Sequence, residues 1–61
     1  MKLSHIRTLG TALRRLEEGR DRIRKVEDEE ANADLIRIRK LVSLDIGTLR
    51  GLIARFNHGD D

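Results

Sequence analysis

With 61 residues, 39% of them charged and 2% aromatic, this chain is too short for more than one domain and too poor in rings for a base-stacking platform. It has no cysteine and two histidines, so disulfides and thiolate metal sites are excluded, no metal or cofactor is expected, and self-association is the expected source of added stability. No apolar run approaches the roughly 20 residues that cross a bilayer, and the lack of cysteine fits a reducing compartment, so we expect a cytoplasmic protein without a membrane partner.

The first half of the chain carries apolar residues at three- and four-residue spacing, the pattern of an amphipathic helix. We expect this helix to run from about residue 4 to residue 30, with the Ser4 side chain as a candidate N-terminal cap. The apolar stripe is interrupted at Gly19 and Arg20. Its members are Leu3, Ile6, Leu9, Leu13, Leu16, Ile23 and Val26.

An acidic block separates two basic arms. Residues 26–34 hold five acidic and no basic side chains, and we expect the chain to turn at about residues 30–33. In a hairpin these carboxylates lie at a solvated tip. If each chain instead formed one long helix in an antiparallel dimer, the block would lie against its own copy. Each close like-charge pair there would cost on the order of 1 kcal/mol, which favours the hairpin and leaves the long helix as the alternative.

The second half of the chain has a wider apolar stripe, and we expect a helix over residues 33–56 followed by a frayed acidic tail at 57–61. The two stripes mirror each other about Ala31, so that Ile6 falls opposite Phe56 and Leu16 opposite Ile46. The expected fold is therefore an all-α antiparallel helical hairpin. The apolar stripe of the second half consists of Leu35, Ile38, Leu41, Val42, Ile46, Leu49, Leu52, Ile53 and Phe56.

The second helix has more apolar surface than one partner helix can cover. Leu44 and Ile36 are the clearest leftovers, and Ser43, Gly47 and Gly51 add a strip of small residues that would let another helix approach. We therefore expect a homo-oligomer, as a dimeric four-helix bundle or a larger helical assembly. The residues expected at the partner interface are Leu41, Leu44, Gly47, Gly51 and Leu52.

Basic residues near the open end of the hairpin are the candidates for contact with nucleic acid. Convergent cations can bind phosphate, although charge runs more often serve solubility or form ion pairs. Residues 35–56 also permit a helix-turn-helix interpretation with a turn at 44–47, but the mirror with the first helix favours a continuous helix through Gly47. The candidate nucleic-acid-binding residues are Arg7, Arg14, Arg15, Arg50 and Arg55.

A hairpin of this size, with its turn near Ala31 and its second helix ending in Ala54-Arg55-Phe56, resembles the Rop family of plasmid copy-number regulators. The resemblance implies a dimeric four-helix bundle that binds paired RNA loops. On the RNA-contacting face of helix one, Lys25 matches the family pattern, whereas Arg14 occupies the position of its aromatic residue.

Catalysis is not expected, because the chain has no cysteine, no tyrosine and no glycine-rich phosphate loop, and so small a core cannot desolvate a carboxylate pair. The sequence thus predicts a small non-enzymatic interaction module, a regulator or adaptor that acts through self-association and protein partner binding. The alternative is a regulator that binds RNA or DNA through the basic residues named above.

Overall fold

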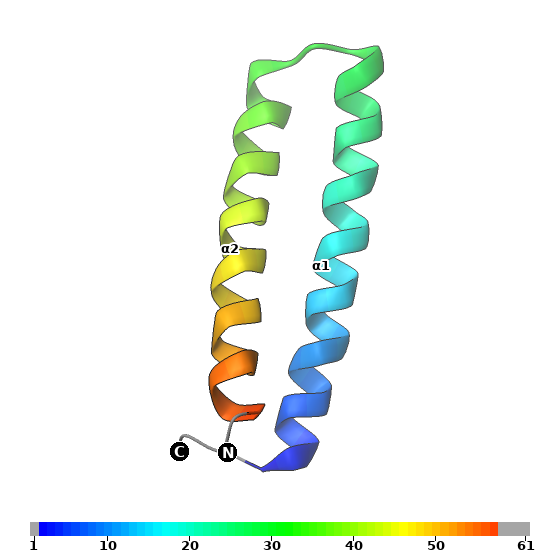
Figure 1. Ribbon diagram of the computed structural model, residues 1–61. Coiled ribbons are helices and arrows are strands. Elements are labelled where there is room, and N and C mark those ends of the chain that lie inside the picture. The colour runs from blue at the N-terminus through cyan, green and yellow to red at the C-terminus, as the bar shows by residue number, and fades with distance from the viewer. Residues whose placement is uncertain (1, 58–61) are drawn as a thin grey trace.

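Two antiparallel helices make up the fold. The computed structural model describes residues 2–57 and consists of α1 (Leu3–Glu29) and α2 (Ala33–Asn57), which lie side by side (Figure 1). The predicted all-helical hairpin is confirmed, and the alternative of one long helix is wrong, because the chain reverses between the two helices. Of the acidic tail expected at 57–61, Asn57 is the last residue of α2, and residues 58–61 lie outside the described part of the chain.

The start of α1 differs from the sequence-based expectation. Lys2 occupies the N-cap position with an extended backbone, and no side chain caps this end. Ser4 is already inside the first turn, where its carbonyl oxygen accepts a hydrogen bond of 2.9 Å from Thr8 Oγ1. The capping role expected for Ser4 is therefore wrong, because a capping side chain must come from the extended residue that precedes the helix.

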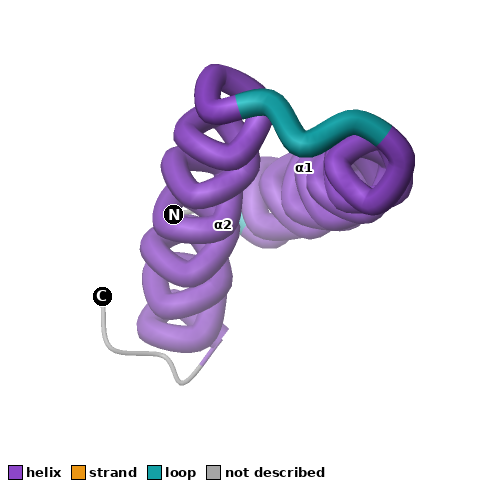
Figure 2. The backbone as a smooth tube through the Cα atoms, turned by 90° about the horizontal axis from the view of Figure 1, so that it is seen from above, coloured by secondary structure: helices purple, strands orange, loops and turns teal. Residues whose placement is uncertain are grey.

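The reversal uses three residues, Glu30, Ala31 and Asn32, which form the loop seen in Figure 2. Glu30 is extended, and its backbone N–H donates to the Val26 carbonyl at 2.8 Å. Asn32 Oδ1 accepts from the backbone N–H groups of Asp34 at 2.8 Å and Leu35 at 3.3 Å. Asn32 is thus the N-terminal cap of α2, and its side chain satisfies donors that have no partner within the helix.

The hairpin is long and thin. Its Cα extents are 43 × 15 × 12 Å, and its radius of gyration is 14.1 Å, whereas a compact domain of this length has a value of roughly 10.5 Å. Within residues 2–57, Ile46 is the only fully buried side chain, with 2% of its surface exposed. The contact between α1 and α2 is therefore a single seam and encloses almost no interior.

The seam of α1 follows a seven-residue repeat of half-buried side chains, namely Ile6, Leu13, Arg20 and Glu27. This repeat explains why the predicted apolar stripe does not all face α2. Leu16 and Val26 lie to one side of the seam and are 37% and 48% exposed. On α2 the corresponding half-buried column consists of Leu35, Val42, Leu49 and Phe56.

α2 is continuous through Gly47, so the turn that a helix-turn-helix requires at 44–47 is absent and the continuous-helix interpretation is confirmed. Ile36 was expected to be left without a neighbour, but it is half-buried beside the seam. Leu44, the other expected leftover, is 67% exposed.

Candidate interaction surfaces

The seam divides the long surface of the hairpin into two faces. At 100° per residue, a residue three positions after a seam residue lies about 60° to one side, and a residue four positions after it lies about 40° to the other. In α1, Leu16 and Glu17 therefore lie on opposite sides of Leu13. In α2, Ile38 and Arg39 lie on opposite sides of Leu35.

Two ion pairs between the helices identify one of these faces. Glu17 accepts from Arg50 Nη2 at 2.8 Å, and Glu27 accepts from Arg39 Nε at 2.5 Å. Glu17, Arg39 and Arg50 lie on the same side of the seam, which we call the ion-pair face, and Glu27 is a seam residue that Arg39 reaches from that side. The tip was expected to hold solvated carboxylates, but Glu27 is an exception, because only 11% of its side chain is exposed. Asp28, Glu29, Glu30 and Asp34 are exposed as expected.

The opposite side of the seam, which we call the apolar face, collects aliphatic side chains from both helices. Four of them are more than a third exposed: Leu16 at 37%, Val26 at 48%, Ile38 at 47% and Leu41 at 55%. Others on this face are half-buried. By its position in the seven-residue repeats, the face comprises Leu9, Ala12, Leu16, Gly19, Ile23 and Val26 of α1 with Ile38, Leu41, Asp45, Thr48, Leu52 and Arg55 of α2.

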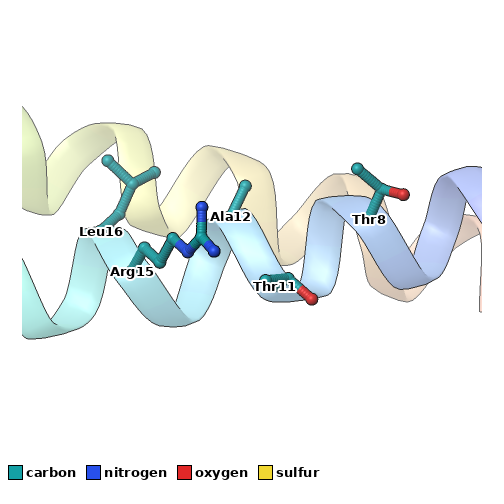
Figure 3. A pocket seen from close by; sticks show the side chains of 5 residues that line it. All are labelled: Thr8, Thr11, Ala12, Arg15 and Leu16. Carbon is teal, nitrogen blue, oxygen red and sulfur yellow. The ribbon is translucent and has the colours of Figure 1, made fainter.

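A shallow hollow lies on the outer side of α1 and borders this surface at Ala12 and Leu16. It is lined by Thr8, Thr11, Ala12, Arg15 and Leu16. Figure 3 shows that Thr8, Ala12 and Leu16 project from the same side of α1. The hollow exists because Ala12 is smaller than Thr8 and Leu16, which lie about one helical turn before and after it. A partner side chain could enter there.

The expected partner-interface residues divide between two surfaces. Leu41 and Leu52 belong to the apolar face, whereas Leu44, Gly47 and Gly51 lie on the side of α2 that points away from α1. A Cβ atom added at either glycine would meet nothing within 4 Å, so this outer side of α2 is open. Gly19, where the apolar stripe of α1 is interrupted, is open in the same sense but lies on the apolar face.

The five candidate nucleic-acid-binding arginines are exposed but do not converge on one face. Arg7 and Arg14 directly follow seam residues and lie toward the ion-pair face, where Arg50 is held by Glu17. Arg15 lines the hollow on the other side. Arg55 lies on the apolar face, in the same seven-residue column as Leu41. The five arginines are therefore spread over different sides of the hairpin.

Among residues 2–57, no group of three or more His, Cys, Asp or Glu side chains could hold a metal ion. Neither α1 nor α2 combines the length and hydropathy that a bilayer-crossing helix needs. The surfaces of this part of the chain are thus defined by exposed aliphatic groups and by ion pairs.

Comparison with known proteins adds no relative: no family model, no curated protein and no solved structure matches the chain. The resemblance to the Rop family thus rests on the size of the hairpin, the position of its turn and the residues named in the sequence analysis. Sequence reasoning missed the cap formed by Asn32 and the placement of Arg20 and Glu27 in the seam. The signals were present, since Asn is a favoured cap residue and both charged residues continue the repeat of Ile6 and Leu13.

Proposed function

We propose that the protein is a small non-enzymatic helical interaction module, a regulator or adaptor that self-associates and binds a protein partner through its helix faces. The observation that carries the proposal is the ratio of exposed to buried aliphatic side chains. In residues 2–57, Ile46 is the only fully buried one, whereas four are more than a third exposed on the apolar face alone.

A single hairpin of this shape leaves several large aliphatic side chains largely in water. Burial of a Leu, Ile or Val side chain contributes about 1.5–3 kcal/mol, and Val26, Ile38 and Leu41 each keep about half of their surface in water. Association would cover this surface. A dimeric four-helix bundle or a larger helical oligomer is the assembly that such amphipathic hairpins form most simply.

The second part of the proposal concerns the outer side of α2. Leu44 is the most exposed of the large apolar side chains in residues 2–57, and it lies beside the open strip at Gly47 and Gly51. One helix of a partner protein could pack there, because glycine permits close approach of a second backbone. This surface is separate from the apolar face, so oligomerisation and partner binding can occur on the same molecule.

Sedimentation equilibrium over a range of protein concentrations tests self-association. We expect the mass to exceed that of one chain, and a chain that stays monomeric at high micromolar concentration would overturn the proposal. Pull-down with the wild-type chain and with Leu44→Lys then tests the outer side of α2. Any partner retained equally by both does not use that surface.

The competing function is nucleic-acid binding, supported by Arg7, Arg14, Arg15 and Arg55, which form no ion pair within residues 2–57. A gel-shift series with paired RNA loops and with duplex DNA at two salt concentrations separates the two functions. Tight binding that weakens steeply with salt would favour this competitor, because each neutralised phosphate releases counterions. No shift at low salt would remove it.

A further inference from the structure

We infer that a second copy of the chain covers the apolar face in the reversed orientation, so that each acidic tip lies beside the basic open end of the other copy. This inference rests on the proposed self-association and adds which face is covered and how the two hairpins are aligned.

The apolar face suits a second copy better than the outer side of α2 does, because it is continuous across both helices. Its charged residues are Asp45 and, at the open end, Arg55, with Arg15 at its border beside Leu16. The small residues Ala12 and Gly19 recur at seven-residue spacing within it, which leaves space for aliphatic side chains of the opposite hairpin, and the hollow adjoins the face at Ala12. The outer side of α2 offers one helix only.

The exposed area of the hairpin agrees with one missing neighbour. The chain exposes 4989 Å², whereas a compact protein of 7.0 kDa exposes roughly 4,000 Å². The difference is about the area that each partner buries in a stable interface, roughly 800 Å². One additional hairpin on one face would therefore bring the exposed surface to the value usual for a compact chain.

The distribution of charge selects the orientation. Residues 2–16 and 46–57, which form the open end, hold six basic side chains and no acidic one. Residues 26–34, which form the tip, hold five acidic side chains and no basic one. Two hairpins aligned in the same direction would bring tip to tip and open end to open end. The reversed alignment brings opposite charges together at both ends, which favours this register over the parallel one.

This arrangement leaves the ion-pair face and the outer side of α2 uncovered. Leu44, Gly47 and Gly51 therefore stay available in the assembled protein.

A spin label at the tip tests the alignment directly. The chain has no cysteine, so Ala31→Cys introduces a unique exposed attachment site. Double electron–electron resonance on the labelled full chain should give an intermolecular distance near the 43 Å length of the hairpin. Hairpins aligned in the same direction would give roughly 10–20 Å, from the 8–10 Å between packed helix axes. Dilution with unlabelled chain should remove the signal, which shows that it is intermolecular.

The outcomes distinguish this inference from the proposed function. A dimeric mass with the short distance keeps self-association and overturns the reversed alignment. A monomeric mass without any intermolecular distance overturns both. Salt gives a second readout: the reversed dimer should dissociate more readily as salt rises, whereas a dimer with like charges together should become tighter.

Two glycine substitutions form a matched pair that tests the face. Gly19 lies on the apolar face and Gly47 on the outer side of α2, and a Cβ atom at either meets nothing within 4 Å. Gly19→Glu and Gly47→Glu add the same charge and the same helix propensity, and circular dichroism checks that both variants remain helical. We expect Gly19→Glu to weaken the dimer at least tenfold and Gly47→Glu to leave it within twofold. Any other pattern overturns the assignment of the face.

Discussion

Arg39 of α2 donates through Nε to Glu27 of α1 at 2.5 Å, and this pair joins the two helices next to the turn with 22% and 11% of the two side chains exposed. It is the least exposed of the three ion pairs found within residues 2–57. Hydrogen bonds to charged groups in such partly buried settings contribute more than those on open surface.

Arg39→Met is expected to lower the free energy of unfolding by about 1.5–3 kcal/mol, because it leaves the Glu27 carboxylate partly buried without its donor. Urea denaturation followed by circular dichroism at one fixed protein concentration measures the change. The double variant with Glu27→Gln should cost less than the sum of the two single changes. Simple additivity would mean that the two side chains do not interact.

Arg50→Met provides a contrast, since 61% of the Arg50 side chain is exposed where it pairs with Glu17. We expect a loss of about 0–1 kcal/mol, which decreases further at high salt because exposed pairs are screened. The same urea series with and without added salt checks this. A loss as large as that of Arg39→Met would contradict the ranking of the two pairs by burial.

Asn32→Ala removes the side-chain oxygen that accepts from the Asp34 and Leu35 backbone, and we expect destabilisation by about 1 kcal/mol. Asn32→Asp is the matched control, because aspartate keeps an acceptor at the same position. Thermal unfolding of both variants should show a lower midpoint for the alanine variant only. Equal midpoints for wild type and Asn32→Ala would show that the cap is dispensable.

Ile46→Ala should cost about 2–5 kcal/mol and Ile46→Val about 0.5–1.5 kcal/mol, because Ile46 is the one side chain that residues 2–57 bury completely. Leu44→Ala, at a site 67% exposed, is the control and should change stability by less than about 0.5 kcal/mol. Chemical denaturation of the three variants provides the comparison. A large effect at Leu44 would show that the oligomer covers this side chain.

Gly47→Ala should stabilise the protein by about 1 kcal/mol, because alanine favours the helix and the added methyl group meets no neighbour within 4 Å. The thermal midpoint at fixed concentration measures the gain. A loss of stability would mean that another chain approaches the backbone at Gly47, which would place the dimer interface on the outer side of α2.

The helical hairpin was predictable because the apolar residues keep one period through each half of the chain and the acidic block breaks that period between them. The facing of individual side chains was harder to predict. A stripe defined by three- and four-residue spacing does not specify its centre, and the centre of α1 lies on the column of Ile6 and Leu13. Arg20 and Glu27 continue that column, although we expected the stripe to be interrupted at Arg20 and Glu27 to lie at a solvated tip.

The candidate surfaces were predictable in type but less so in position. Exposure of Leu44 agreed with the expectation, whereas Ile36 is half-buried, because it directly follows the seam residue Leu35. Pairing of Arg39 and Arg50 with carboxylates of α1 depends on which side of the seam each long side chain occupies. That choice follows from the rotation of each helix about its axis, which apolar spacing alone leaves loosely determined.

The three-residue loop contains neither glycine nor proline, so nothing in its covalent structure prevents Glu30, Ala31 and Asn32 from becoming helical. If they did, α1 and α2 would merge into a single rod, and two rods could exchange their second halves while keeping the seam contacts. The hairpin and the exchanged form thus differ at only a few backbone dihedrals. The Asn32 cap and the repulsion between neighbouring carboxylates then decide which topology the chain adopts. The choice between hairpin and exchanged rod is therefore made by the polar residues of the turn and not by the apolar seam.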